Sequence, residues 1–350
     1  MSAFTLYFVF PGKLDTPTGG YHYDRRLIDE LRALGLDVVT VPLPDDFPFP
    51  DERAREESRR ILAALPDGAV VIFDGLAFGA LDDLAIAEAQ RLRLIALCHH
   101  PLALESGLDA TQQQAFLNSE TRALQCTRAV VVTSDHTGRI LTADYGVPPE
   151  RIVAALPGTD RAPFAACNGD PPRLLTVASL TRRKAHDVLI EALAPLVDIP
   201  WQARFVGGVD FDPAWAGALQ NRVNQLQLQD RISFVGAVDE LQAEYHNADL
   251  FVLPSRFEGY GMVFAEALAS GLPVIAARAG AVPYVVPETA GLLVPADDAE
   301  ALSDALRRIL LNEDLRRQLQ AGARSAAKAL PTWSDSARRV ARLVEEVQQL

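Results

Sequence analysis

The chain has 350 residues and a formal net charge of −13 at pH 7, and 49% of its residues are hydrophobic. At roughly 150 residues per domain this length predicts two domains, and the composition excludes disordered, collagen-like and membrane-spanning chains. The acidic balance argues against a sequence-independent nucleic-acid binder, because such proteins neutralise phosphates with clustered Lys and Arg.

The N-terminal sequence, MSAFTLYFVFPGKLD, has neither a basic leading segment nor a small-residue cleavage site. We therefore expect a first β-strand here, no secretory signal, and a cytoplasmic protein. The three cysteines are isolated and form no C-x-x-C pair. This usage fits neither a disulfide framework nor a zinc ribbon, and it agrees with reducing surroundings.

The first half alternates short runs rich in Val, Ile and Phe with helical patterns. Such runs are typical of parallel strands buried on both faces. In the first helical pattern, Leu27, Leu31 and Leu34 share one face and Gly35 follows. The expected strands are residues 4–10, 37–41, 69–74, 93–98, 129–134 and 151–158.

The same alternation begins again after a Pro-rich passage at residues 160–172. Two successive sets of β-α units predict an α/β fold with two doubly wound, Rossmann-like domains around a ligand cleft. We place the domains at residues 1–165 and 166–332, and expect a last helix, 333–350, to pack back on the first domain. The second set of strands is expected at 173–179, 203–208, 231–238, 249–255, 273–277 and 291–295.

Residues 254–276, PSRFEGYGMVFAEALASGLPVIA, carry the strongest functional pattern. A buried strand precedes a glycine-containing loop and a helix, whose free N–H groups attract oxyanions. Glu258 in the loop is expected at the carboxyl ends of the strands, where ligands bind in open α/β sheets. Glu266 has apolar neighbours, so a buried carboxylate there needs a partner such as a vicinal diol. The alternative is a surface glutamate and an ordinary loop charge.

Two further segments suit an anionic ligand. The segment SLTRRKAHD, residues 179–187, follows a strand, and cations at a helix start are unfavourable unless an anion binds there. The segment TPTGG, residues 16–20, ends in Gly19 and Gly20, which permit close backbone approach to a phosphate. Their alternatives are a solvated basic helix start and a turn that only links a strand to a helix.

Histidines follow the fourth expected strand in CHHPLALESG. His99 and His100 can face a ligand there, or they form a turn with satisfied imidazoles. Glu105 is either an acceptor contact or a solvated carboxylate. The other histidines lack metal-ligand spacing and no D-x-D motif occurs, so no metal site is expected. The G-x-G at residues 259–261 has Phe264 at the third glycine position of a dinucleotide fingerprint, which argues against NAD chemistry.

Residues 254–276 resemble the E-x7-E signature of the family 4 retaining glycosyltransferases, which have the GT-B fold. The resemblance extends to PGTD at 157–160, to the glycine pair and to residues 179–193, and so spans nearly the whole chain. It implies transfer of a sugar from a nucleotide-diphosphate sugar, with UDP- or GDP-sugars favoured, to an acceptor hydroxyl. It also implies that no cofactor and no metal ion are needed besides the nucleotide-sugar co-substrate.

The resemblance implies roles for individual residues. Glu258 and the backbone of residues 259–262 would hold the donor sugar and phosphate, and Glu266 the ribose hydroxyls. Lys184, helped by Arg182, would stabilise the departing diphosphate. The implied catalytic residues are Lys184, Glu258 and His99; the donor-binding residues are Gly19, Gly20, Arg182, Lys184, Glu258, Gly259, Tyr260, Gly261, Met262 and Glu266; His100 and Glu105 are acceptor candidates.

The sequence departs from the family pattern at two positions. The usual Arg of G-R-L-x-x-x-K is Ser179 here, which weakens stabilisation of a leaving group unless Arg182 or Arg183 substitutes. His100 stands where the family has the Asp of His-Asp-Pro. The alternatives are therefore a sugar-nucleotide epimerase or hydrolase of the same fold, and a non-catalytic protein that binds a glycan or a partner.

The acceptor stays open among sugars, lipids, proteins and small molecules, as do the nucleotide base and the oligomeric state. The sequence DDFPFP, residues 45–50, is a candidate contact for an acceptor or a membrane surface, with its two aromatic side chains expected to be exposed.

Overall fold

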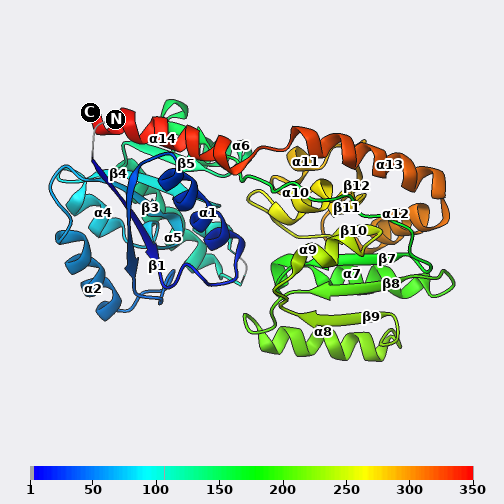
Figure 1. Cartoon of the computed structure of the whole chain (residues 1–350). Coiled ribbons are helices and arrows are strands. Elements are labelled where there is room, and N and C mark those ends of the chain that lie inside the picture. Colours follow the sequence, from blue (N-terminus) through cyan, green and yellow to red (C-terminus); the bar gives the residue numbers. More distant parts are fainter. Residues whose placement is uncertain (1–3, 106, 350) are drawn as a thin grey trace. The chain divides into compact units, whose positions relative to one another are not determined.

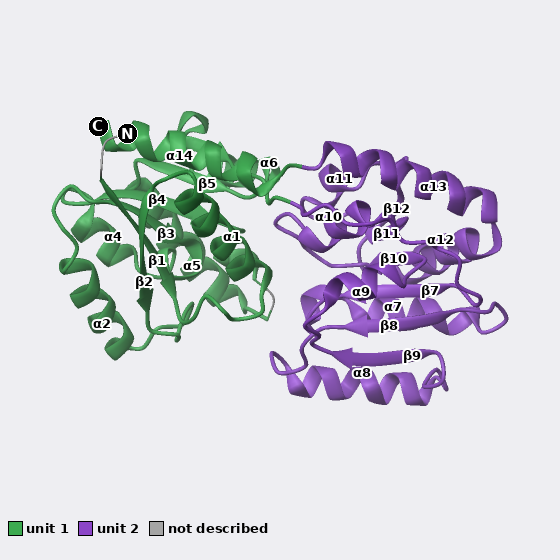
Figure 2. Cartoon of the chain, in the orientation of Figure 1, with its two compact units in different colours: residues 1–158, 331–350 green, residues 159–330 purple. Residues whose placement is uncertain are grey.

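The computed structural model describes residues 4–105 and 107–349. The chain divides into two compact units, Met1–Gly158 with Pro331–Leu350, and Thr159–Leu330 (Figure 2). We call them unit 1 and unit 2. Each contains a six-stranded parallel sheet surrounded by helices (Figure 1), which confirms the α/β class with two Rossmann-like domains. The division lies a few residues from the boundaries expected at 165/166 and 332/333.

The sheet of unit 1 has the order β2-β1-β3-β4-β5-β6. Because β1 pairs with both β2 and β3, the order reverses beside β1, and ligands bind at such a switch point in open α/β sheets. Every residue of β3 and β5 is buried, as their apolar runs predict for all but Asp74, the last residue of β3. The strands are β1 (Thr5–Pro11), β2 (Asp37–Leu43), β3 (Val70–Asp74), β4 (Arg93–Cys98), β5 (Ala129–Val132) and β6 (Ile152–Ala154).

The helices of unit 1 follow the strands in the expected alternation. Most have a side-chain cap, as in α5, where Asp109 and Gln112 form a reciprocal capping box. The helices are α1 (Gly19–Ala33), α2 (Glu52–Ala63), α3 (Gly75–Phe78), α4 (Asp82–Glu88), α5 (Ala110–Gln125), α6 (Asp135–Asp144) and α14 (Trp333–Gln349).

The sheet of unit 2 has the order β12-β11-β10-β7-β8-β9, so its switch point lies between β7 and β10. The strands are β7 (Arg173–Val177), β8 (Gln202–Val206), β9 (Ile232–Gly236), β10 (Leu250–Leu253), β11 (Val274–Ala277) and β12 (Gly291–Val294). The α-helices are α7 (His186–Leu193), α8 (Pro213–Gln225), α9 (Leu241–His246), α10 (Met262–Ala269), α11 (Val282–Val285), α12 (Ala299–Leu311) and α13 (Glu313–Ala326).

The C-terminal helix α14 packs in unit 1, although unit 2 precedes it in the chain. Trp333, at its first residue, is 4% exposed and makes edge contacts with the rings of His22 and Tyr23 on α1, each at 5.7 Å between centroids. The guanidinium of Arg26 lies 5.0 Å from the Trp333 ring centre. Gly158 completes this packing, because a Cβ there would lie 2.1 Å from the backbone nitrogen of Trp333.

We predict that Trp333→Ala lowers the free energy of unfolding of the chain by about 3–5 kcal/mol, because it removes a large buried ring that α1 packs against. Urea unfolding followed by fluorescence and far-UV circular dichroism measures the loss. Arg338→Ala, an exposed change on the same helix, is the control and should stay within about 0.5 kcal/mol of the unchanged chain. A loss of under 1 kcal/mol in Trp333→Ala would contradict the packing role.

Candidate functional site

The loops that follow β7 and β10 meet at the switch point of unit 2. The loop after β10 carries Arg256 and Glu258, and the loop after β7 carries a short 3-10 helix, Arg182–Lys184. The backbone N–H of Arg256 donates to the carbonyl of Arg183 at 2.8 Å, which joins the two loops directly. Because β7 and β10 are neighbours in the sheet, residues about 74 positions apart come together here.

Glu258 is the centre of this contact. Its carboxylate is buried, with 5% of the residue exposed, and accepts a hydrogen bond from Lys184 Nζ at Oε1 over 2.7 Å. Arg183 Nη1 lies 3.4 Å from Oε2 and donates to the carbonyl of Phe257 at 3.0 Å. Burial raises the pKa of Glu258, but Lys184 and Arg183 outweigh this and hold the pKa below its usual value. Glu258 is therefore an ionised acceptor at neutral pH.

Arg256 fixes the geometry of both loops. Its Nη2 donates to Asp187 Oδ2 at 2.8 Å at the start of α7, and its Nε donates to Asp297 Oδ1 at 2.6 Å. The same guanidinium donates to the carbonyl of Arg182. Arg256 could not be predicted from the sequence, because its three acceptors lie in segments far from it along the chain.

Two glycines, Gly261 and Gly280, permit the backbone conformation of the loop after β10 and its close packing. Gly280 has a φ of +56°, and a Cβ there would lie 2.2 Å from the carbonyl oxygen of Glu258. Ala281 donates its N–H to that same oxygen at 2.9 Å. Gly261 has a φ of +89° before α10, and a Cβ would lie 2.5 Å from the ring of Phe264. Within the described residues, no side chain caps the start of α10 at Met262, so its first N–H groups can donate hydrogen bonds to an anion.

Glu266 lies on α10 and receives a hydrogen bond from the hydroxyl of Tyr245 on α9, at 2.8 Å to Oε2. Burial raises the pKa of Glu266 above its usual value; the bond from Tyr245 opposes that shift, and Asp160 adds to it. Tyr245 is itself 2% exposed. Helical spacing within α10 could not reveal this partner, because it comes from another helix.

The basic segment divides between two environments. Arg182 lies over the ring of Trp215, 4.2 Å from its centre, with Nε 4.0 Å from Asp212. The structure thus brings Arg183 and Lys184 to Glu258 and leaves Arg182 beside α8. Gly259, Tyr260, Gly261 and Met262 follow Glu258 directly into the start of α10, and Tyr260 is buried at 8% exposure.

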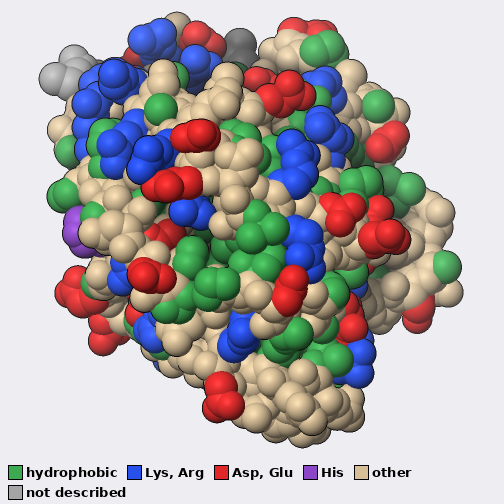
Figure 3. All heavy atoms as spheres, turned by 90° about the vertical axis from the view of Figure 1, so that its right-hand side faces the viewer, with side chains coloured by type: hydrophobic (Ala, Val, Ile, Leu, Met, Phe, Trp, Pro, Cys, Tyr) green, Lys and Arg blue, Asp and Glu red, His purple; other side chains and the backbone are tan. Residues whose placement is uncertain are grey.

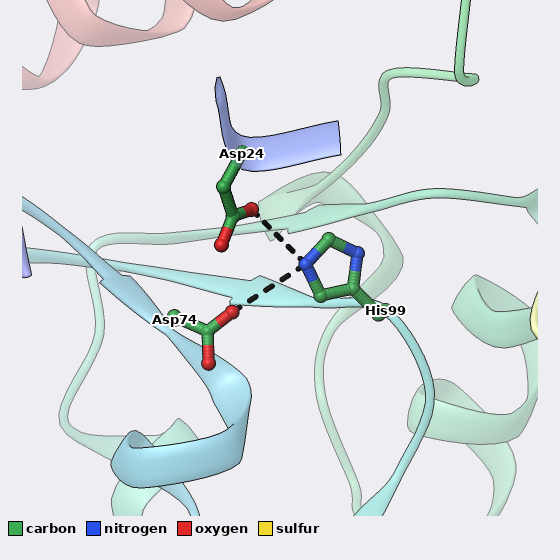
Figure 4. A group of neighbouring side chains, drawn as sticks. All are labelled: Asp24, Asp74 and His99. Atoms are coloured by element: carbon green, nitrogen blue, oxygen red, sulfur yellow. Dashed lines mark hydrogen bonds and ion pairs between the residues drawn. The ribbon is translucent and has the colours of Figure 1, made fainter. Parts of the chain in front are cut away.

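Unit 1 has its own cluster of charged side chains beside its switch point (Figure 4). His99 Nε2, just after β4, lies 3.1 Å from Asp24 Oδ1 on α1 and 3.4 Å from Asp74 Oδ2 at the end of β3. Burial lowers the pKa of His99, but the two carboxylates outweigh it and raise the pKa to about 10. Burial and Asp74 raise the pKa of Asp24 to about 7, although His99 acts to lower it.

Of this cluster, the sequence pattern indicates only His99. Asp74 is the last residue of the buried strand β3, and a charged residue at the carboxyl end of an apolar run is a signal that could have selected it. Asp24 lies within the polar-looking run of α1 and has no such pattern. The nearest nitrogen and oxygen atoms of the three side chains, which come from three elements, lie within 4.8 Å of one another, a closeness that sequence spacing cannot reveal.

The remaining predicted residues of unit 1 lie nearby. A Cβ at Gly20 would lie 3.4 Å from the His99 ring, so this glycine, next to Gly19 at the start of α1, leaves the backbone close to the imidazole. His100 Nε2 pairs with the carboxylate of Glu105. The two acceptor candidates therefore contact each other.

The expectation of two exposed aromatics in residues 45–50 is wrong for one of them. Phe47 is 8% exposed and belongs to the core of unit 1, whereas Phe49 is 56% exposed and lies against the ring of Phe116 at 5.2 Å. None of the helices in the described part of the chain is both long and apolar enough to cross a membrane. On the face drawn in Figure 3, basic and acidic side chains are interspersed around a central group of hydrophobic ones.

Comparison with known proteins identifies both halves of the chain. Residues 161–326 match the family described as glycosyl transferases group 1, and residues 16–162 match glycosyltransferase family 4. The chain is 34% identical over 248 residues to the D-inositol 3-phosphate glycosyltransferase of Saccharomonospora viridis. That alignment covers 65% of this chain and 57% of the relative, so this chain spans a little over half of the relative's length.

Two solved structures share the fold across nearly all of the chain. Sucrose-phosphate synthase from Thermosynechococcus elongatus has a TM-score of 0.83 at 24% identity, over 98% of each chain. HepE from Anabaena, in complex with UDP and glucose, has a TM-score of 0.76 at 16% identity, over 97% of this chain and 99% of that chain. At these identities the likeness shows the fold, which is GT-B.

We predict that Gly280→Ala lowers the free energy of unfolding by about 2–4 kcal/mol, because the added Cβ combines a strained backbone with a collision against the Glu258 carbonyl. Gly146→Ala is the matched control: its φ is +65° but no atom lies within 4 Å of the added Cβ. That control should lose only about 1–2 kcal/mol. Equal losses in urea unfolding would show that Gly280 serves the backbone angle alone.

Proposed function

This chain belongs to the family 4 glycosyltransferases, and we propose that it transfers a sugar from a nucleotide-diphosphate sugar to an acceptor hydroxyl with retention of configuration. UDP- and GDP-sugars are the favoured donors, and the UDP and glucose held by HepE support the former. The observation that carries the proposal is the buried Glu258 carboxylate, paired with Lys184 beside the uncapped start of α10.

Unit 2 has the chemistry that a nucleotide-diphosphate sugar requires. A diphosphate is an anion that Lys184, Arg183 and the first N–H groups of α10 can neutralise together. On binding, Lys184 would turn from Glu258 towards the diphosphate, and Glu258 would accept hydrogen bonds from the sugar hydroxyls in exchange. The Glu266 carboxylate, oriented by Tyr245, is a suitable acceptor for the two ribose hydroxyls.

The same cations act in the transition state of the proposed reaction. As the bond between the anomeric carbon and the phosphate oxygen breaks, negative charge grows on the diphosphate, and fixed cations stabilise it without reorganisation. The acceptor hydroxyl would attack from the face that the diphosphate leaves, with a donor phosphate oxygen taking its proton. Because the protein cations neutralise the leaving group, we propose that the reaction needs no metal ion. The acceptor would bind to unit 1.

Ser179, in the position of the family arginine, favours a second candidate function. A protein that binds nucleotide sugars and has lost transfer would keep the donor site and tolerate the missing cation. The position of Arg183 beside Glu258 supports transfer instead, because Arg183 would supply a second cation, in addition to Lys184, for the diphosphate.

We predict that one nucleotide family among UDP, GDP, ADP, dTDP and CMP, with their common sugars, stabilises the chain in a thermal-shift panel. At 100 times its dissociation constant the ligand adds about 2.7 kcal/mol to the free energy of unfolding. Glu266→Ala should abolish the shift, whereas Glu300→Ala, an exposed change in the same unit, should retain it. No shift with any nucleotide would refute the donor site; an undiminished shift in Glu266→Ala would refute the role of Glu266.

We also predict that Lys184→Ala lowers kcat/KM at least about 100-fold, because it removes a cation from the leaving group. The variant leaves the buried Glu258 with Arg183 as its remaining cation, so a loss of stability is expected as well, and the assay is run well below the midpoint of unfolding. Lys328→Ala, an exposed lysine of unit 2, is the control. Transfer measured by mass spectrometry at the unchanged rate would remove Lys184 from the mechanism.

A further inference from the structure

The cluster of Asp24, Asp74 and His99 contains more buried charge than the packing of unit 1 requires. Asp24 is 0% exposed in the middle of α1, and Asp74 is 3% exposed. A carboxylate without water is costly unless it is paired, and an apolar residue of similar size would pack α1 at lower cost. We therefore look for the role of Asp24 in its effect on the protonation of His99, the side chain that it contacts.

The carboxylates of Asp24 and Asp74 contact the same atom of the His99 imidazole. Asp24 Oδ1 lies 3.1 Å and Asp74 Oδ2 lies 3.4 Å from Nε2 of His99. Both contacts are made to Nε2 and not to Nδ1. An acceptor on each side requires that Nε2 carry a proton. In Figure 4, Nδ1 lies on the side of the ring that faces away from both carboxylates.

The neighbouring side chains also hold the imidazole ring of His99 in its orientation. Tyr23 on α1 contacts the imidazole edge-on at 5.3 Å between ring centres, and the backbone of Gly20 lies against the ring, where an added Cβ would be 3.4 Å from Cδ2. The groups that face the cluster from α1 are phenols, Tyr21 and Tyr23, whose pKa values are raised by burial and which stay neutral. Asp24 and Asp74 are thus the charges that set the state of His99.

The second oxygen of Asp24 supports the same interpretation. Asp24 Oδ2 is buried and has no hydrogen-bond partner among the described residues. A buried, unpartnered carboxylate oxygen is unfavourable when ionised, and a positive imidazole at the other oxygen of Asp24 offsets that cost. The two carboxylates at Nε2 therefore favour the protonated imidazole, in agreement with a pKa of His99 raised to about 10.

We propose, building on the function proposed above, that Asp24 is a positioning residue that keeps His99 doubly protonated and directs its Nδ1–H at a bound ligand. His99 then acts as a fixed hydrogen-bond donor to a sugar hydroxyl or phosphoryl oxygen, and not as a general base. Asp74 supplies the balancing negative charge from the opposite side. The assignment explains why a buried acid lies opposite a histidine in unit 1.

The test follows the protonation of His99 directly. The full chain is labelled with carbon-13 at the Cε1 of its six histidines, and His99→Gln assigns the His99 signal. Titration by NMR from pH 5.5 to 10 is then compared for the unchanged chain, Asp24→Asn and Asp29→Asn. Asp29 is an exposed acid on the same helix and controls for the loss of one negative charge.

We expect His99 to stay protonated beyond pH 8 in the unchanged chain and in Asp29→Asn, and its midpoint to fall by at least one pH unit in Asp24→Asn. If Asp24→Asn does not fold, Asp74→Asn gives the same comparison, because the asparagine retains an oxygen for the cap on Leu76. A midpoint near 6.5 in the unchanged chain, or an unchanged midpoint in the folded variant, overturns the proposal. Selective broadening of the His99 signal by micromolar Mn²⁺ would overturn it in favour of a cation site.

The pH dependence of transfer gives a second result that a purely structural role would not produce. With the donor found in the ligand panel, the unchanged chain should show no inflection from His99 in kcat/KM between pH 6 and 8. In Asp24→Asn the inflection should appear at the lower midpoint that the NMR titration gives for that variant, and activity should fall as the pH rises through it, because the donor proton is lost. The NMR titration needs no activity, so it separates failure of this proposal from failure of the proposed function.

Discussion

The site of unit 2 depends on the pairing of one buried carboxylate. Glu258 is ionised although it has little contact with water, and this is tolerable only because Lys184 and Arg183 lie within 3.4 Å of it. The pairing requires that the loops after β7 and β10 be neighbours, and the sheet order makes them so. Arg256 and Gly280 then hold the loops at this separation. The geometry of this candidate site and the sheet order are thus joined by a single electrostatic requirement.

Each unit has a cluster of buried charged side chains, and the balance of charge in the two clusters is opposite. Each places its polar groups beside the point where the strand order reverses, next to the first strand of its sheet. In unit 2 two cations surround one carboxylate, which suits an anionic ligand. In unit 1 two carboxylates surround one imidazole. These opposite balances agree with the proposal that unit 2 binds the anionic donor and unit 1 the acceptor.

The sequence predicts the strands of unit 2 and the positions of Glu258 on a loop and Glu266 on a helix, for physical reasons. Parallel strands buried on both faces leave uninterrupted apolar runs, and a strand-loop-helix unit with Glu258, Gly261 and Glu266 has a fixed spacing. Partners from other elements leave no such pattern. Tyr245 and Arg256 were missed because their acceptors lie in distant segments. Arg183 could not be distinguished from Arg182, because the two are adjacent in one short 3-10 helix and only the folded structure shows which guanidinium lies near Glu258.

The return of α14 to unit 1 has a consequence for the order in which the chain folds during synthesis. Unit 2 is one continuous segment, Thr159–Leu330, and all of its contacts become available once that segment has left the ribosome. Unit 1 lacks the buried face of α14 until the chain has been translated beyond it. The domain that is made first is therefore completed last, and α1 exposes the apolar surface that Trp333 covers throughout the interval.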